Sequence, residues 1–516
     1  MSKKKVIYIN GADLTIDTVW AVAHGEGHCL VQLDENARVK MRASRSYIES
    51  RMKSGEAIYG VNTGFGAFSS VRISDQEIEQ LQRNLIRSHC VGVGDPFTIH
   101  ETRAIMYLRA NCLANGNSGI RDVVVDKILE FLNNGIIPVI PQQGSVGASG
   151  DLAPLSHLAL AVIGEGEAWH AGVVTPVQTL LEQKGIRPLD LQAKEGLSMI
   201  NGCQVMTAVG LLNAYEARRL VWMADLAGAM TLEAMQGSRS AFDPLIAAVR
   251  PHHGEAETAR NLMKLLGPTS EIGESHASCG RVQDAYSLRC MPAVHGAAKS
   301  TLRRAVETLT IEANSSTDNP LVFCEEKKIL SCGNFHGEPA AFVLDFMCIA
   351  VSAMASMSEC RIEKLINPAM SGLPAFLAPH GGLNSGLMIV QVAAAALVSE
   401  NKILSHPASV DSIPTSADKE DHVSMGTIAA RKLSQIVKNA ESIVAMELLA
   451  AAQALDFLKP LKAAGAVQVV HDLIRTQIPF AREDRVFSKD ILLMKQMIRA
   501  ESLYECVHLA VGPLEW

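Results

Sequence analysis

The chain has 516 residues, with 47 Lys and Arg against 54 Asp and Glu, which gives a formal net charge of −7. Hydrophobic residues make up 48% of the chain and aromatic residues 5%, so its apolar content is mainly aliphatic. This composition excludes an intrinsically disordered chain, and the slightly acidic balance gives no electrostatic footprint for nucleic acid. We expect a soluble protein with a large core and no nucleic-acid partner.

Short elements are predicted in the first part of the chain. The first five residues begin like an export signal, but the apolar run 6–9 is too short to continue as one. Strands are expected at 6–9, 31–33 and 136–137, and the prolines within 137–141 favour extended backbone. Eleven cysteines without a CxxC pair indicate reduced thiols, so we expect a cytoplasmic location.

Long helices are predicted beyond residue 200. Apolar residues recur at three- and four-residue steps around 302–309, 342–360 and 433–458, and the alanine run within 391–400 is a strong helix former. The expected fold is mainly α, a long antiparallel helix bundle (201–516) with a smaller loop-rich N-terminal region (1–200) that holds few short strands. The apolar stretch at 386–399 is shorter than the roughly 20 residues that span a membrane, so no membrane partner is expected.

Several short patterns resemble binding motifs without completing one. The segment 24–29 holds His24, His28 and Cys29, but its two glycines favour a surface loop, and 252–253 is expected to be a turn. Glycine pairs at 64–66 and 92–94 complete neither GxGxxG nor a P-loop. We therefore expect no metal site and no nucleotide site.

The segment 144–155, GSVGASGDLAPL, allows three interpretations. The local sequence alone favours a flexible loop before a helix that Asp151 caps. A GxSxG nucleophile elbow would need glycine at position 151. The third interpretation is cyclisation, in which the Gly150 nitrogen attacks the Ala148 carbonyl. Ring closure releases one water, and dehydration of Ser149 releases a second. The product would be a methylidene-imidazolone electrophile.

Residues 147–155 resemble the cofactor-forming signature of the aromatic amino acid ammonia-lyases and related aminomutases. Further blocks resemble that family in the same order: YGVNTGFG at 59–66, NG at 201–202, QDAYSLR at 283–289, SSTDNP at 315–320 and GNFH at 333–336. The resemblance extends from about residue 57 to 460. It makes cyclisation the favoured interpretation of Ser149.

The resemblance implies a catalytic apparatus. Ala148, Ser149 and Gly150 would form 4-methylidene-imidazol-5-one (MIO) autocatalytically, with no external cofactor, and this electrophile would make the substrate amine a good leaving group. Tyr59 would be the general base at the β-carbon if its phenol is held partly ionised, and Tyr286 would hydrogen-bond the substrate, the cofactor or the developing carbanion. The remaining implied residues bind or support the substrate and cofactor: Asn201, Gln283, Arg289 (on the carboxylate), Asn319 and Phe335. Taken singly, Arg289 would more often be a surface or salt-bridging residue, Phe335 a core residue and Asn201 a turn residue, but their occurrence together in family order favours the functional roles.

Two positions discriminate among substrates within the family. Histidine lyases, and some tyrosine aminomutases, carry Ser-His where this chain has Ser88-His89, whereas phenylalanine lyases have Phe-Leu and tyrosine lyases His-Leu. Glu420 stands where phenylalanine and tyrosine enzymes usually have glutamine, and its carboxylate suits an imidazole N–H. His89 can offer a donor or an acceptor to the other ring nitrogen.

The expected reaction is elimination of ammonia from L-histidine to give trans-urocanate. A tyrosine or phenylalanine lyase, or a 2,3-aminomutase, is the alternative within the family. A non-catalytic helical oligomer is the alternative outside it. The resemblance also implies a homotetramer whose active sites draw on more than one subunit.

Overall fold

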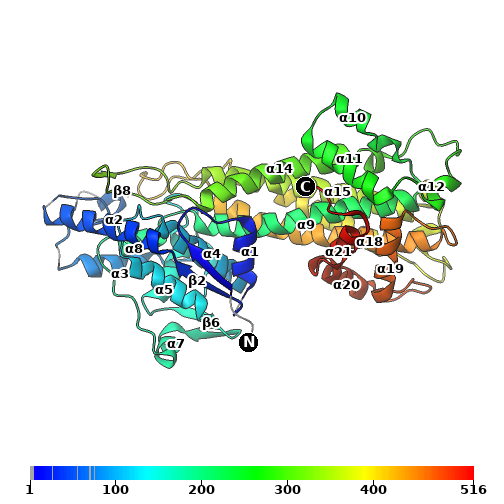
Figure 1. Cartoon of the computed structure of the whole chain (residues 1–516). Coiled ribbons are helices and arrows are strands. Elements are labelled where there is room, and N and C mark those ends of the chain that lie inside the picture. The colour runs from blue at the N-terminus through cyan, green and yellow to red at the C-terminus, as the bar shows by residue number, and fades with distance from the viewer. Residues whose placement is uncertain (1–4, 26, 55, 69–70, 75) are drawn as a thin grey trace. The chain divides into compact units, whose positions relative to one another are not determined.

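The computed structural model describes residues 5–25, 27–54, 56–68, 71–74 and 76–516 (Figure 1). The first four residues of the predicted export-like start, and Glu26 of the metal-like segment, lie outside this range. The described chain consists mainly of helices, with a few short strands in its first and middle parts. The predicted fold class is thereby confirmed.

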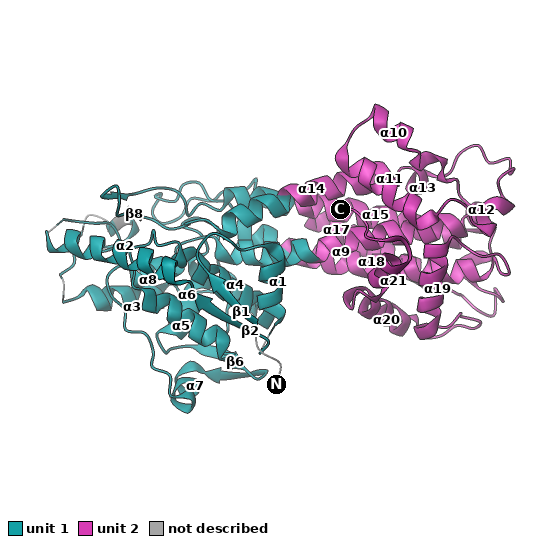
Figure 2. Ribbon diagram, in the orientation of Figure 1, with its two compact units in different colours: residues 1–215, 305–345, 407–431 teal, residues 216–304, 346–406, 432–516 magenta. Residues whose placement is uncertain are grey.

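The chain divides into two compact units (Figure 2). Unit 1 comprises residues 1–215, 305–345 and 407–431, and unit 2 comprises 216–304, 346–406 and 432–516. Both units receive residues from the same four long helices: α9 Gln204–Ala234, α14 Met291–Ala313, α15 Glu338–Ile366 and α18 Gly426–Asp456. The division therefore differs from the single boundary near residue 200 that the sequence suggests.

Unit 1 contains all the described strands, in four small sheets. β1 pairs with β2 in parallel, whereas β3–β5, β4–β6–β7 and β8–β9 are antiparallel. The strands are β1 Lys5–Ile9, β2 Cys29–Leu33, β3 Val93–Pro96, β4 Ile137–Pro138, β5 Pro141–Gln143, β6 Glu167–His170, β7 Val173–Pro176, β8 Leu321–Phe323 and β9 Lys328–Leu330. The strands predicted at 6–9 and 31–33 are confirmed.

Shorter helices surround these sheets in unit 1. They are α1 Ile16–His24, α2 Glu35–Lys53, α3 Ile78–His89, α4 Ile99–Ala114, α5 Asp122–Asn133, α6 Leu152–Val162, α7 Val177–Lys184 and α8 Glu195–Ile200, with a 3-10 turn η1 at Gly66–Phe68. His24 ends α1 and Cys29 begins β2, so the metal-like segment is the connection between them.

Unit 2 contains helices and connecting loops but no strand among its described residues. Its shorter elements are η2 Arg239–Phe242, α10 Pro244–Val249, α11 His253–Leu266, α12 Glu271–Ser275, α13 Tyr286–Arg289, α16 Pro368–Ser371, η3 Ala375–Leu377, α17 Met388–Leu404, α19 Gly465–Gln477, α20 Phe487–Arg499 and α21 Ser502–Val511. The turn expected at 252–253 is instead the start of α11, with His252 at its N-cap.

The predicted apolar stripes of two long helices, α18 and α15, differ in burial. In α18 the predicted stripe is the core face, because Leu433, Ile436 and Val444 are fully buried. In α15 the predicted stripe is partly on the surface, since Phe346 is 51% exposed and Ile349 is 49% exposed. α15 is also long and apolar enough to cross a membrane by length and composition, but 61% of its most apolar window is buried, as in a core helix.

Candidate active site

A cavity of about 800 Å³ in unit 1 brings together six of the residues that the sequence singled out. They are Tyr59, His89, Ser149, Asn201, Asn319 and Glu420. The other lining residues are mostly apolar side chains from η1, α3 and α8. No Lys or Arg is among the described residues that line this cavity, so it has a carboxylate but no cation of its own.

The loop before α6 is sharply bent at the residues that would cyclise. Ser149 has φ +52°, uncommon for a residue with a side chain, and Gly150 has φ +75°. A Cβ at Gly150 would lie 2.1 Å from the Gly202 carbonyl oxygen, so no other residue fits there. The Gly202 N–H donates to the Ser149 carbonyl at 3.2 Å, and the Asp151 N–H donates to the Gly202 carbonyl at 2.7 Å. These residues therefore meet the steric needs of cyclisation: a tight bend, a small residue and an obligatory glycine.

Asp151 anchors this loop to the start of α9. Its position is the N-cap of α6, as the plain-loop interpretation expects, but its side chain makes no capping bond to α6. The carboxylate instead accepts the Val205 and Met206 N–H groups, both at 3.0 Å, at the first turn of α9. It also accepts the hydroxyls of Ser145, at 2.8 Å, and Thr427. A fully buried carboxylate with four donors fixes the loop against two distant segments.

Glu420 faces the central serine of the loop. Its Oε1 accepts the Ser149 hydroxyl at 3.1 Å, and its Oε2 accepts the Thr415 hydroxyl at 2.8 Å. The backbones of Thr415 and Glu420 also exchange hydrogen bonds at 2.9 and 3.4 Å. Between them, residues 416–418 all have positive φ without being glycine, which stores roughly 1 kcal/mol or more of strain at each. This strained turn orients the carboxylate toward the loop.

The protonation of His89 follows from its neighbour. The Ser88 hydroxyl donates its single hydrogen to the Leu85 carbonyl at 3.0 Å, and its oxygen lies 3.0 Å from His89 Nδ1. Nδ1 must therefore carry the proton, which leaves Nε2 as an acceptor. Burial lowers the pKa of His89, although the Leu85 carbonyl and Glu420 oppose this shift. His89 is thus a neutral acceptor.

The surroundings of Tyr59 in unit 1 do not favour its predicted role as a general base. Burial raises the pKa of its phenol, the Gly66 N–H at 3.5 Å lowers it, and the charge of Glu420 raises it further. A phenol that acts as a base needs a lowered pKa. The cation that could lower it is not among the described cavity residues.

Asn201 is hydrogen-bonded to a buried ion pair, Asp318 with Lys194, that the sequence did not predict. Its Nδ2 donates to Asp318 Oδ1 at 3.1 Å, and Asp318 Oδ2 accepts the Lys194 ammonium at 2.7 Å. Both charged side chains are fully buried. Burial raises the pKa of Asp318, but Lys194 outweighs it and holds the pKa below its usual range. The one sequence signal for this network was Asp318, which directly precedes Asn319 in the SSTDNP motif at 315–320.

Phe335 does not line the cavity. Its carbonyl accepts the Cys203 thiol at 3.1 Å, directly after the Asn201-Gly202 pair. In the described chain it therefore supports the segment behind the loop by a backbone contact.

The remaining candidates, Gln283, Tyr286 and Arg289, form a separate group in unit 2. Arg289 Nη2 donates to Gln283 Oε1 at 3.1 Å, and its guanidinium lies 4.7 Å from the centre of the Tyr286 ring. Tyr286 is 71% exposed. The group carries the positive charge that the unit 1 cavity lacks.

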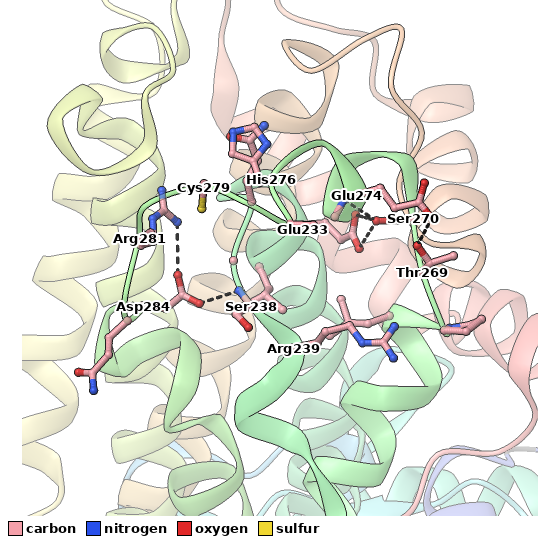
Figure 3. Close-up of a pocket in the computed structure, with 18 of the residues that line it drawn as sticks. Glu233, Ser238, Arg239, Thr269, Ser270, Glu274, His276, Cys279, Arg281 and Asp284 are labelled. Atoms are coloured by element: carbon pink, nitrogen blue, oxygen red, sulfur yellow. Dashed lines mark hydrogen bonds and ion pairs between the residues drawn. The ribbon is translucent and has the colours of Figure 1, made fainter.

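A second cavity, of about 360 Å³, lies beside this group in unit 2 and includes Gln283 in its wall (Figure 3). Several of its polar groups are paired with one another: Ser270 donates to Glu233, and Asp284 bridges the Ser238 N–H and Arg281. It contains neither Tyr286 nor Arg289.

Comparison with known proteins agrees with the cavity's chemistry. The family model for aromatic amino acid lyases matches residues 14–476.

The chain belongs to the aromatic amino acid lyase family.

Relatives in this lyase family are similar over nearly the full length. A histidine ammonia-lyase of Koribacter versatilis is 52% identical and matches 97% of this chain and 99% of its own length. The crystal structure of histidine ammonia-lyase from Trypanosoma cruzi has a TM-score of 0.91 at 42% identity, covering 98% of this chain and 96% of that one. A tyrosine aminomutase from Streptomyces globisporus has a TM-score of 0.93 at 36% identity, covering 99% and 100%. The fold is thus shared by lyases and aminomutases.

Proposed function

We propose that this chain is a histidine ammonia-lyase, which eliminates ammonia from L-histidine to give trans-urocanate. The observation that carries the proposal is the pair of acceptors on the cavity wall, the Glu420 carboxylate and His89 Nε2. An imidazole ring offers an N–H to one acceptor, and its protonated form offers one to each. A benzene ring offers neither and would leave a carboxylate unpaired at considerable cost.

The cofactor proposal rests on the bent loop. Ala148, Ser149 and Gly150 would form the methylidene-imidazolone ring, which supplies an electrophile for the substrate amine. Cyclisation removes the Ser149 oxygen as water, so Glu420 Oε1 loses its present donor and is left able to accept a substrate N–H. Asn201, oriented by Asp318, presents an amide to the same cavity.

The base and the carboxylate clamp require a contribution from outside the unit 1 cavity. We propose that Arg289, with Gln283 and Tyr286, enters the cavity of another copy of the chain. There its guanidinium would bind the substrate carboxylate and favour ionisation of Tyr59. The exposed apolar residues of unit 2 support self-association: Phe346 and Ile349 on α15, and Ile389 and Val392 on α17. We propose a homotetramer, as the family resemblance implies.

The test is turnover of L-histidine, followed by urocanate absorbance, with L-tyrosine and L-phenylalanine as parallel substrates. We expect activity with histidine alone. Turnover of tyrosine without histidine would overturn the substrate assignment in favour of a tyrosine lyase or aminomutase. Intact-mass measurement is the independent test of the ring, since cyclisation removes two waters and an unmodified mass would refute it.

A further inference from the structure

A cluster of two histidines and a glutamate lies beside the candidate active site in unit 1 and has no part in the proposed reaction. His336 and Glu338 flank the start of α15, and His422 follows Glu420 by two positions. One ligand atom from each lies within 4.8 Å of the others. Glu338 Oε2 is 4.0 Å from His336 Nδ1 and 4.0 Å from His422 Nε2, and the two rings are parallel within 8°.

The glutamate oxygen at the centre of this cluster is incompletely satisfied. Glu338 Oε2 is buried and accepts no hydrogen bond from any described residue. A buried carboxylate oxygen without a donor costs several kcal/mol unless a proton, a cation or water reaches it. The two imidazole nitrogens are the nearest groups that an ion could share with it.

Hydrogen bonds already orient His336 as a ligand. Its Nε2 is 3.2 Å from the His422 carbonyl, which can only accept, so Nε2 carries the proton. Its Nδ1 accepts the Glu338 N–H in a long hydrogen bond of 3.3 Å, so the Nδ1 lone pair lies on the side of the glutamate, and a metal ion bound there would replace this hydrogen bond. A ring that donates one N–H to a backbone carbonyl and turns the other nitrogen inward has the usual arrangement of a metal-bound histidine.

We propose that His336, Glu338 and His422 form a binding site for a divalent transition metal of the zinc class. Two imidazoles and one carboxylate are a known zinc ligand set, and the 71% exposed His422 leaves a fourth position open to water. Magnesium and calcium prefer all-oxygen ligands and do not suit this set. With bonds of about 2.0–2.1 Å, ligand atoms of a tetrahedral site lie roughly 3.4 Å apart. Metal binding would require the 4.0 Å distances to shorten to about this value through rotation of the Glu338 and His422 side chains.

The proposed metal site does not depend on the proposed histidine lyase activity. Its expected effect is structural, because it would connect two segments near the candidate active site. Two of its ligands lie just before and at the start of α15, and the third lies on the segment that carries Glu420. A bound ion would tie these two segments of unit 1 together. No metal-binding spacing in the sequence predicts this group, because 336 and 338 are 84 or more positions from 422.

The experiment measures metal binding directly on the full-length, chelator-stripped protein. Zn²⁺ is titrated in competition with a chromophoric chelator, and Co²⁺ serves as a spectroscopic probe. We expect one Zn²⁺ per chain with micromolar affinity, and Co²⁺ bands typical of nitrogen and oxygen ligands. Because all eleven cysteines are free, a Co²⁺–thiolate charge-transfer band would report binding elsewhere.

Three variants locate the site. His422→Ala and the isosteric Glu338→Gln should each weaken Zn²⁺ binding at least about 100-fold. His253→Ala, at an exposed histidine in unit 2 that pairs with Glu257, should leave it unchanged. Equal affinity in wild type and both ligand variants would overturn the proposal. So would an affinity of wild type weaker than roughly 0.1 mM, since three ligands with an open position bind more tightly than that.

Discussion

The two groups of candidate residues contrast in burial and charge. The unit 1 cavity is built from residues held by buried networks, such as Asp151 and Asp318, and it offers acceptors without a cation. The unit 2 group is carried by the short helix α13 and its preceding loop, with an exposed Tyr286 and the Arg289 guanidinium, which has no carboxylate partner among the hydrogen bonds of the described residues. A zwitterionic amino acid needs both kinds of group. Under the proposed function, neither region is a complete site by itself.

The most demanding test mixes two inactive chains. Ser149→Ala should abolish turnover by removing the cofactor precursor, and Arg289→Ala should lower it at least about 100-fold by removing the clamp. Co-expressed, the two variants should regain about a quarter of the wild-type rate, because random assembly pairs an intact cavity with an intact Arg289 in one site of four. Urocanate formation by the purified mixed oligomer is the measurement.

The matched control pairs Ser149→Ala with Glu420→Ala. Both substitutions lie in the unit 1 cavity, so no assembly contains an undamaged copy of it, and no activity should return. A failure of the first pair to regain activity would show that each site is complete within one chain.

Glu420→Gln tests the acceptor character of the cavity. Loss of a charge-assisted hydrogen bond costs about 1.5–3 kcal/mol, so kcat/KM for histidine should fall roughly 10- to 100-fold. Intact mass should still show loss of two waters, which separates a substrate effect from a failure to cyclise. An unchanged kcat/KM would remove Glu420 from imidazole recognition.

Ser88→Ala tests the fixed tautomer of His89. Without the serine oxygen, Nδ1 loses a partner and both tautomers become accessible, so KM should rise a few-fold, about the worth of one neutral hydrogen bond. Ser88→Thr retains the hydroxyl and should restore the wild-type KM. Equal KM in all three proteins would assign the serine to helix capping alone.

Glu312→Gln tests the protonation of the buried region behind the cavity. Burial raises the pKa of Glu312 to about 7, opposed by the Cys203 thiol and reinforced by the charge of Asp151. The folded state therefore binds a proton that the unfolded state releases near pH 4.5, and stability falls as pH rises from there through 7. The total loss is roughly 3 kcal/mol.

Melting temperatures at pH 5 and pH 8 measure this effect. The Tm of the wild type should decrease more from pH 5 to pH 8 than the Tm of Glu312→Gln, because the amide of the variant does not titrate. Glu326→Gln, in an exposed turn between β8 and β9, should behave like wild type. A parallel pH response in wild type and Glu312→Gln would mean that Glu312 does not titrate on unfolding.

The sequence predicts elements and reacting groups better than it predicts their surroundings. Periodicity located α18 and its buried face correctly, because a helix in a core must be apolar on that side. The same periodicity selected a partly exposed face on α15, since an apolar stripe does not reveal what covers it. Motifs placed Ser149 and Glu420 in one cavity although they are 271 positions apart.

Three structural features could not be predicted, because they depend on contacts between residues that are distant in the sequence. Asp151 has the position of a cap for α6 but bonds to α9, and Lys194 is a fully buried cation paired with Asp318, 124 positions away. Tyr59 has the right type for a base, yet its environment in unit 1 raises its pKa. Each outcome is decided by partners distant in sequence.

The anchoring of the cofactor loop has a consequence for biosynthesis. The Asp151 carboxylate is held by Val205 and Thr427, which follow it by 54 and 276 positions, and the Met425 N–H donates to the Val146 carbonyl. A ribosome must therefore synthesise more than four-fifths of the chain before these anchors exist. The methylidene-imidazolone ring that we propose would then form only on a nearly finished polypeptide, so an incomplete nascent chain would not expose a strong electrophile to the thiols and amines of the cell.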